Sequence, residues 1–511
     1  MNHYDIIIIG TGAGGGTLAH KLAPSGKKIL VLERGSFLPR EKDNWDTVQV
    51  FQKDKYHTDE VWLDKKGRNL RPGTSYYVGG NTKVYGGALF RLRERDFEEV
   101  RHHGGISPEW GLKYLDFEPY YAEAEKLYQV HGKQGIDPTE PTRNEDYAYP
   151  PISHEPRIQE IHDKLAHKGL NPFYLPLAVR LNEVDRTISE CIRCNTCDGF
   201  PCLVNAKSDA DVTCIRPAIA NNNLTLLTEA KVTRLYTNGT GTEITGVEAE
   251  VNNEVQVFSA DIVVVSCGAI NSAVLLLRSS SDKHPNGLAN SSDRVGRNFM
   301  KHQNGAIVGI TTKPNLSVFQ KTIGINDFYW GEAGFDFPMG HIQLLGKVDK
   351  DMIAMDAPKF APDRGLQDIA NHSVDWWLTA EDLPEANNRV QLKNNRISLE
   401  YTHNNTEAFD RLMKRWTGIL RSIDCGETIF PLSLYFRKRI PLQGVAHQVG
   451  TCRFGEDPKT SVLDLNCRTH DVDNLYVVDG SFFPSSGAVN PSLTIMANAM
   501  RVGEHILERM G

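Results

Sequence analysis

Several protein classes are excluded by what this sequence of 511 residues does not contain. No uncharged apolar run approaches the roughly 18 residues of a transmembrane helix. The N-terminus enters an apolar stretch directly, without the basic region and small-residue cleavage site of a signal peptide. A long basic block is also missing and the formal net charge is -7, which argues against nucleic acid or an anionic membrane as the main partner. We therefore expect a soluble, cytoplasmic protein without a membrane span that binds a small molecule.

Cysteine is scarce, with nine in the whole chain, so a disulfide scaffold is excluded. The 43 glycines and 25 prolines are close to average usage, and neither an internal repeat nor a low-complexity tract occurs. Collagen, coiled coil and disorder are therefore excluded as well. With 40% hydrophobic residues over this length, we expect about three folding units, or two larger ones, around a large core.

The chain begins with a strand–helix–strand pattern. Residues 4–9 include four consecutive isoleucines, and such an unalternating run is typical of a parallel strand buried on both faces. A helix-like segment at 17–22 and a second apolar strand at 28–32 follow. The pattern predicts the βαβ unit of an α/β fold.

A GxGxxG string, Gly10-Thr11-Gly12-Ala13-Gly14-Gly15, lies between the first strand and the helix. In such a string Gly10 permits a tight turn, Gly12 lets the backbone approach a pyrophosphate, and Gly15 lets helix and strand pack closely. Glu33, at the end of the second strand, is placed to accept hydrogen bonds from ribose hydroxyls. The unit predicts dinucleotide binding, and by itself it does not distinguish NAD from FAD.

Later segments return to the same sheet and then build another. Strands are predicted as a β-meander at 224–228, 231–237, 243–251 and 255–259, followed by a buried strand at 261–266 and a helix at 272–278. From 303 to about 441, alternating segments with aromatic residues predict a second sheet. A strand at 475–478 and a helix at 493–510 are predicted near the C-terminus.

A series of motifs along the chain resembles the glucose-methanol-choline family of flavin oxidoreductases. The motifs are the glycine string with Leu32-Glu33-Arg34-Gly35, a second glycine motif at 78–87, Val232, residues 264–270 with Ser272, residues 295–300, and the segments 477–481 and 490–494. The resemblance spans nearly the whole chain.

The resemblance implies an α/β fold in which a Rossmann-type FAD-binding domain carries a second, mainly antiparallel-sheet domain for substrate. We expect residues 1–137, 205–302 and 444–511 to form the FAD-binding domain and 303–443 the substrate-binding domain, with 138–204 as a connection that includes a cysteine-rich loop. The residues expected to bind FAD are Gly10, Gly12, Gly15, Glu33, Gly80, Asn81, Thr82, Val84, Tyr85, Gly86, Val232, Gly268, Asp479, Gly480 and Ser492. Val84 stands where pyranose-oxidase relatives carry a flavin-linked histidine, so the FAD is expected to be held noncovalently.

The implied reaction is oxidation of a CH–OH group to a carbonyl by hydride transfer to FAD, with a sugar or glycoside as the expected substrate. His447 matches the family's catalytic histidine and is expected to take the hydroxyl proton, while Asn490 positions the oxygen. The strand that ends near Asp479 should bring both segments to one sheet edge. For His302 a structural role is favoured over a place in the site.

Two residues of the second sheet, Gln343 and Trp376, are candidates for contact with a sugar substrate, with Trp377 beside them. An aromatic side chain there can stack on a sugar ring, although packing in the core is the favoured role.

Four cysteines form a cluster, Cys191-x2-Cys194-x2-Cys197-x4-Cys202, and Cys214 follows twelve residues later. The spacing approaches a ferredoxin run, but the last gap is four rather than three residues, and Pro201 precedes the final cysteine instead of following it. An iron–sulfur cluster, a zinc site and a metal-free loop remain open. We favour the metal-free loop.

Other functions fit parts of the pattern. They are a flavin-containing lyase of the same fold that performs no redox chemistry, an iron–sulfur-linked sugar or sterol dehydrogenase that passes electrons through the cysteine loop, and an NAD-dependent dehydrogenase. Bleaching of the flavin by substrate, iron content and a yellow colour distinguish these from an alcohol oxidoreductase. The sequence does not indicate whether oxygen, a quinone or a protein accepts the electrons.

Overall fold

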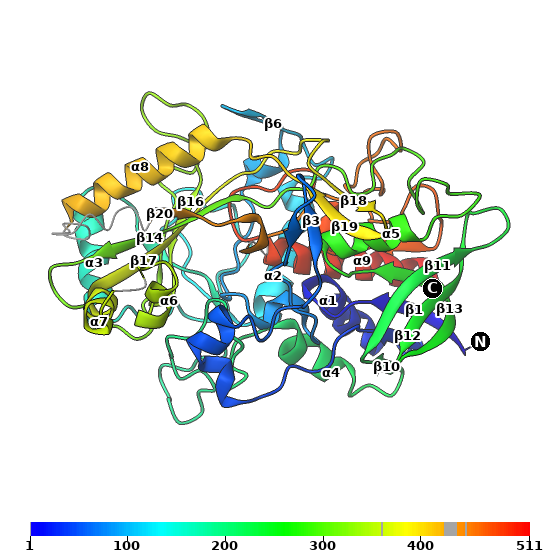
Figure 1. Cartoon of the computed structure of the whole chain (residues 1–511), viewed down its shortest axis with the longest axis horizontal. Coiled ribbons are helices and arrows are strands. Elements are labelled where there is room, and N and C mark those ends of the chain that lie inside the picture. The colour runs from blue at the N-terminus through cyan, green and yellow to red at the C-terminus, as the bar shows by residue number, and fades with distance from the viewer. Residues whose placement is uncertain (1, 359–360, 424–436, 445–446) are drawn as a thin grey trace.

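The structure is a computed structural model that describes residues 2–358, 361–423, 437–444 and 447–511. Two large sheets lie at opposite ends of an elongated molecule, and both chain termini lie at the end that holds the first sheet (Figure 1). None of the helices within these ranges combines the length and apolarity needed to cross a membrane.

The first sheet is built on parallel strands. β1 (Asn2–Ile9) lies between β2 (Ile29–Leu32) and β13 (Glu254–Val265), and β10 (Leu224–Leu227) and β21 (Leu475–Val477) extend the parallel part. Ile6, Ile7 and Ile8 are fully buried, as expected for a central strand covered on both faces. The predicted βαβ unit is confirmed.

The meander differs from its prediction at both ends. β11 (Ala230–Thr237), β12 (Ile244–Val251) and β13 pair antiparallel as expected, but β10 pairs with β2 in parallel. The strands predicted at 255–259 and 261–266 are one strand. The first half of β13 pairs with β12 and its last residues pair with β21, so a single strand serves both parts of the sheet.

Four helices pack against this sheet and each other. α1 (Ala13–Leu22) contacts α9 (Ser492–Met510), which in turn contacts α2 (Tyr114–Leu127), while α5 (Ala269–Arg278) contacts β11. The short α4 (Arg216–Ala218) also touches α1. These helices and the sheet enclose the larger hydrophobic core.

The second sheet is antiparallel throughout, which confirms the predicted fold class. Its order is β20 (Arg437–Arg439), β14 (Gln303–Ile310), β17 (Ser373–Ala380), β16 (His341–Leu344), β15 (Ile323–Ile325) and β8 (Phe173–Tyr174). α8 (Thr406–Ser422) contacts β14 and β17, and α3 (Pro156–His167) joins the same core. α6 (Lys350–Ala354) and α7 (Asp363–His372) lie at this end as well (Figure 1).

Smaller sheets connect the predicted domains. β18 (Arg389–Lys393) and β19 (Arg396–Glu400) join β3 (Trp62–Asp64) and β4 (Asn69–Leu70), and two-stranded pairs form from β5 (Val100–His102) with β6 (Gly105–Ser107) and from β7 (Val130–His131) with β9 (Leu177–Ala178). Segment 389–400 therefore pairs with the N-terminal part, and β8 comes from the predicted connection. The domain limits themselves stay a prediction.

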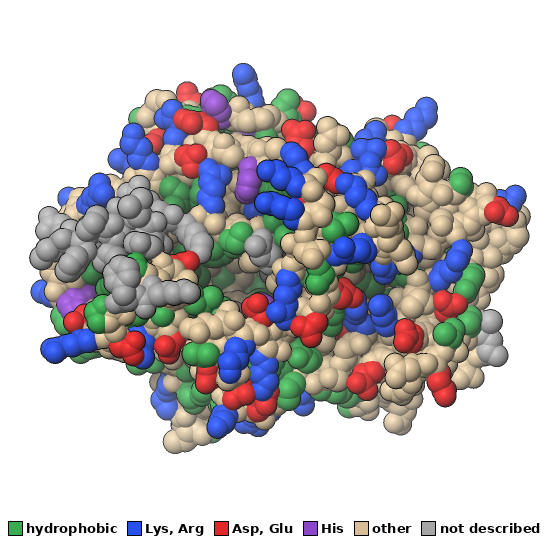
Figure 2. All heavy atoms as spheres, viewed as in Figure 1, with side chains coloured by type: hydrophobic (Ala, Val, Ile, Leu, Met, Phe, Trp, Pro, Cys, Tyr) green, Lys and Arg blue, Asp and Glu red, His purple; other side chains and the backbone are tan. Residues whose placement is uncertain are grey.

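Figure 2 shows the same face of the molecule, hollowed near its middle.

Candidate active site

A large cavity opens where the parallel strands of the first sheet end. Ile9, Leu32 and Ser266, at the carboxyl ends of β1, β2 and β13, line its floor. Open α/β sheets bind ligands at this edge. The cavity has about 1650 Å³ of empty space, including volume open to solvent.

The tight turn predicted at Gly10 and the close packing predicted at Gly15 are present, and Gly12 borders the cavity. Gly10 has φ +101°, and a Cβ there would lie 2.3 Å from the Ser266 carbonyl oxygen. A Cβ on Gly15 would lie 2.1 Å from the Gly10 carbonyl oxygen, so this glycine allows helix and strand to touch. A Cβ on Gly12 would meet nothing within 4 Å, because Gly12 borders the cavity. The N-terminal amides of α1 therefore face a space that can hold a phosphate group.

Glu33 lines the cavity and also fixes the glycine loop. Its Oε2 accepts from the Thr11 amide at 3.0 Å, and its Oε1 accepts from the Gly35 amide at 3.0 Å. Burial raises the pKa of this carboxyl, and the hydrogen bonds from Thr11 and Gly35 oppose the rise. The carboxylate thus holds the loop in place at the position where a ribose is expected.

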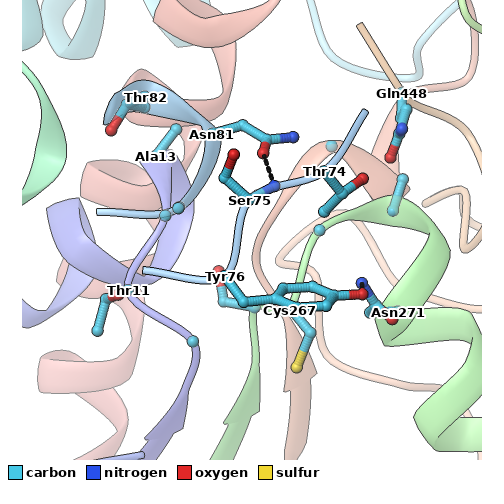
Figure 3. Close-up of a pocket in the computed structure, with 18 of the residues that line it drawn as sticks. Thr11, Ala13, Thr74, Ser75, Tyr76, Asn81, Thr82, Cys267, Asn271 and Gln448 are labelled. Atoms are coloured by element: carbon cyan, nitrogen blue, oxygen red, sulfur yellow. Dashed lines mark hydrogen bonds between the residues drawn. The ribbon is translucent and has the colours of Figure 1, made fainter. Parts of the chain in front are cut away.

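The segment before the second glycine motif forms the opposite wall (Figure 3). Asn81 Oδ1 accepts from the Ser75 amide at 3.0 Å, and Tyr76 extends toward Asn271 on α5, whose amide donates to the Tyr76 hydroxyl at 3.3 Å. The hydroxyl oxygens of Thr74 and Ser75 are buried and lack a partner among the described residues, although both residues line the cavity. Buried polar atoms are normally hydrogen-bonded, so these two indicate a polar ligand that completes the wall.

Asp479 holds together two segments beside the cavity. Its Oδ2 accepts from the Gly268 amide at 2.9 Å and from the Ser272 hydroxyl at 2.5 Å, and its Oδ1 accepts from the Ser481 amide at 2.8 Å. Burial raises the pKa of this carboxyl, with Ser272 and Ser481 opposing the rise. Asp479 therefore joins the turn after β13 to the segment that leads to α9, and it does not itself border the cavity.

Most of the predicted FAD-binding residues meet at this cavity. Those that line it are Gly10, Gly12, Glu33, Gly80, Asn81, Thr82, Tyr85, Gly86, Val232, Gly268, Gly480 and Ser492. Three of the predicted residues do not line the cavity, but each contacts one that does. Gly15 packs on Gly10, the Val84 amide donates to the Asn81 carbonyl, and Asp479 accepts from the Gly268 amide. Their direct contact with the cofactor stays a prediction.

His447 and Asn490 lie together at the same cavity, as their motifs predict. The segment after His447 is hydrogen-bonded to two other segments of the chain, one at Met300 and one at Gly480. Val449 exchanges backbone hydrogen bonds with Met300 at 3.0 Å, and the Gly450 amide donates to the Gly480 carbonyl at 3.0 Å. Asn490 precedes α9, whose N-terminal residues Ser492 and Ile495 also line the cavity. The positive end of this helix favours negative charge placed here.

His302 is the partner of His447. The two Nδ1 atoms are 3.1 Å apart, and His302 Nε2 lies 3.1 Å from the Ser486 carbonyl oxygen. A carbonyl only accepts, so His302 carries its proton on Nε2, and its Nδ1 accepts from Nδ1–H of His447. In this tautomer His447 Nε2 has a free lone pair. His302 is fully buried and does not line the cavity, so it acts on the site only through His447.

Both histidines are uncharged at neutral pH. Burial, together with the nearby His302 and His341 rings, lowers the pKa of His447 to about 3. Burial likewise lowers the pKa of His302 to about 4. A neutral imidazole can accept a proton, so the site holds a ready base.

The two predicted substrate residues lie away from the cavity. The Trp376 side chain is fully buried in the second core, with its ring centroid 4.7 Å from that of Trp416. Gln343 is buried with its Oε1 3.0 Å from His341 Nε2. Neither borders the cavity, and Trp376 has the core role that was favoured over stacking on a sugar. The residues missed from the sequence are Thr74, Ser75 and Tyr76, which directly precede the second glycine motif and show no periodicity.

A cavity at the edge of a parallel sheet, lined by a neutral imidazole and an amide, fits a flavin-dependent oxidoreductase that acts on a CH–OH group, and the family match shows this class. The chain belongs to the GMC oxidoreductase family, whose models match residues 4–304 and 432–499. The cofactor is FAD, and the Thr74 and Ser75 hydroxyls, the open Gly12 face and the helix N-terminus fit it.

Individual relatives agree with this assignment. The chain is 30% identical to paromamine 6'-oxidase of Streptomyces fradiae over 98% of its own length and 90% of that protein. It is 29% identical to 6'''-hydroxyparomomycin C oxidase of Streptomyces lividus over 99% of its length and 92% of that protein. The fold is similar to that of pyridoxine 4-oxidase from Mesorbium loti, with a TM-score of 0.67, 18% identity, and coverage of 98% of this chain and 99% of that one.

Proposed function

We propose that the protein oxidises a hydroxyl group of a sugar or glycoside to a carbonyl, with FAD as the hydride acceptor. The observation that carries the proposal is the hydrogen bond between His302 and His447, which leaves a base of defined tautomer at the cavity beside Asn490. The names of the two relatives support the substrate class, because both refer to aminoglycosides and the first to the 6' position of paromamine.

The chain's own residues handle the proton and the oxygen. His447 Nε2 accepts the hydroxyl proton as the carbon–hydrogen bond breaks, and the Asn490 amide orients the substrate oxygen. As His447 becomes positively charged, its Nδ1–H bond to His302 strengthens, because a charged donor makes the shorter and stronger hydrogen bond. Bound FAD supplies the acceptor for the hydride.

The test is anaerobic reduction of the purified holoenzyme by a panel of sugars, neutral glycosides, aminoglycosides, sterols and simple alcohols. We expect a sugar or glycoside to bleach the visible flavin absorption, and its analogue that lacks the reacting hydroxyl to leave the flavin oxidised. If only a sterol or a simple alcohol reduces the flavin, the substrate class is wrong. If a hydroxyl compound is converted while the flavin stays oxidised, the protein is a lyase and the redox proposal is wrong.

The electron acceptor is identified in the second half of the same experiment. Enzyme reduced by its substrate is mixed with oxygen, a soluble quinone or a one-electron dye, and the return of the flavin absorption is timed. The compound that reoxidises the flavin fastest at equal concentration indicates the class of the electron acceptor.

A further inference from the structure

The cysteine-rich loop packs directly behind the second glycine motif. The Gly199 amide donates to the Val84 carbonyl at 2.9 Å, so the loop touches the residue next to Tyr85 and Gly86 of the cavity wall. None of the eight described cysteines forms a disulfide, and in the described part of the chain no three His, Cys, Asp or Glu side chains converge as metal ligands. The loop as described therefore holds free thiols.

Two of these thiols, Cys194 and Cys197, form a Cys-x-x-Cys pair. The side chains of the two residues are hydrogen-bonded to each other, and the Thr196 hydroxyl donates to Cys194 Sγ at 3.3 Å. Cys194 is partly exposed, while Cys197 is buried. An accessible thiol beside a buried one is the arrangement of a reactive cysteine with its resolving partner.

The thiols of Cys194 and Cys197 also differ in pKa, which is lowered for Cys194 and raised for Cys197. The hydrogen bond from Cys197 lowers the pKa of Cys194 to about 5, with further help from Thr196 and Lys207. Burial raises the pKa of Cys191, in the same loop, to about 11, and that of Cys214 to about 12. Since the thiolate is the nucleophile, Cys194 is the reactive member of the group at neutral pH.

We propose that Cys194 and Cys197 are a site of reversible oxidation by hydroperoxides, and that closing their disulfide slows the reduction of the flavin by substrate.

The chemistry balances with the peroxide as the named oxidant. The Cys194 thiolate attacks one peroxide oxygen, the O–O bond breaks, and a sulfenic acid forms while hydroxide or alkoxide leaves with the electron pair. The Cys197 sulfur then attacks the sulfenic sulfur, and water leaves with the Cys197 proton. Overall, two thiols lose two electrons and two protons, and the peroxide is reduced to water or to water and an alcohol.

Two buried lysines connect this pair to the cavity. Lys207 Nζ donates to the Cys197 carbonyl at 2.8 Å and to the Tyr85 carbonyl at 2.7 Å. Lys321 Nζ donates to Asp198 Oδ1 at 2.5 Å and to the Gly86 carbonyl at 2.6 Å. Both lysine side chains are about 1% exposed. Movement of Cys197 and Asp198 on disulfide closure is thus passed to two residues of the cavity wall.

The first experiment maps the modification in the intact holoenzyme and needs no substrate. Reduced enzyme is treated with stoichiometric hydrogen peroxide, alkylated, digested and examined by mass spectrometry. We expect a Cys194–Cys197 link that dithiothreitol removes, and in Cys197→Ser a Cys194 sulfenic acid that dimedone traps. Cys191→Ser, in the same loop, is the matched control and should form the link at the unaltered rate. Equal alkylation of Cys194 before and after peroxide, or a link to another cysteine, would overturn the proposal.

The second experiment tests the connection to the flavin. The visible flavin spectrum, which requires no substrate, should shift when the disulfide closes and return on reduction. Flavin reduction by substrate should slow by about tenfold, since a displacement of 1 Å can cost up to ~10²-fold in rate. Cys194→Ser should show neither change after peroxide. A link that forms with the spectrum and the rate unaltered would disprove the effect on the flavin, independently of which substrate the enzyme uses.

Discussion

His302 Nδ1 and His447 Nδ1 lie 3.1 Å apart, although the residues are 145 positions apart in the chain. Because His302 Nε2 donates to the Ser486 carbonyl, His302 Nδ1 accepts the hydrogen bond from His447 Nδ1–H. The tautomer of His447, the base at the cavity, is therefore fixed by His302, which need not touch the substrate. His302 has φ +65°, in the left-handed region that non-glycine residues seldom adopt, and such backbone conformations are often found at functional sites.

The first prediction concerns the base itself. His447→Ala should slow flavin reduction by roughly 10² to 10⁴, about 3 to 5 kcal/mol of barrier, since a general base is removed. FAD content should be retained, and stopped-flow absorbance measures the rate. Asn490→Ala should have a smaller effect that appears partly in substrate binding. The two losses should not add, because both residues act on one oxygen. A folded, FAD-replete His447→Ala enzyme with near wild-type rates would disprove the assignment.

The second prediction separates the two roles of the glycine string. Gly12→Ala should fold normally, because its φ of −69° suits any residue and its Cβ meets no protein atom, but it should bind FAD substoichiometrically. Gly15→Ala should instead lower the free energy of unfolding by about 1–3 kcal/mol or prevent folding, because its Cβ would overlap the Gly10 carbonyl. Thermal unfolding and the flavin-to-protein absorbance ratio measure both effects. Full FAD occupancy in Gly12→Ala would contradict the proposed pyrophosphate position.

The third prediction is that FAD is not covalently attached. Acid precipitation should release all of the yellow colour into the supernatant, because Val84 provides no nucleophile for the flavin. Val84 is partly buried behind the cavity wall, where its carbonyl accepts from Gly199. Colour that stays with the precipitated protein would show a covalent link through another residue.

The fourth prediction concerns metal in the cysteine-rich loop. Protein purified without oxygen should contain less than about one iron per chain, because the spacing of Cys191 to Cys202 departs from the ferredoxin pattern. Elemental analysis tests this. Stoichiometric iron with a broad brown absorption would change the function to a dehydrogenase with an external acceptor.

Local patterns predicted much of the fold and the cofactor cavity. The isoleucine run, the glycine string and Glu33 are contiguous in sequence, and their periodicity or spacing expresses one local geometry. His447 and Asn490 were found because each stands in a motif. The substrate side was harder, because Trp376 has the same identity whether it packs in a core or stacks on a sugar, and only its contact with Trp416 decides.

Relationships between distant segments could not be predicted in the same way. The two halves of β13 read as separate strands because their partners, β12 and β21, lie on either side of it in sequence and pair with different parts of it. The sequence favours a structural role for His302, because nothing local shows that its ring meets His447. The cytoplasmic location stays a prediction.

The fifth prediction is a pH dependence, and a pair of His302 variants extends it. A base works in its uncharged form, and burial lowers the pKa of His447 to about 3, well below the 6.5 of a free histidine. The uncharged form therefore persists to lower pH, and flavin reduction should stay level from pH 8 to below 6.5 before it falls at more acidic pH. Rapid-mixing measurements across this range check the prediction. An acidic limb centred near 6.5 would show that His447 is not held in the uncharged form by its surroundings.

A pair of His302 variants connects that pH profile to the hydrogen bond. His302→Asn and His302→Gly both tolerate the left-handed backbone at φ +65°, but only asparagine places an acceptor oxygen near the former Nδ1. His302→Gly should lose about 10- to 100-fold in kcat, the range seen when partners that orient metal-bound histidines are removed, with a smaller change in KM. His302→Asn should recover part of kcat and keep a defined acidic limb. Equal kcat and equal pH profiles in the two variants would show that His302 acts by filling space, and not by fixing the tautomer of His447.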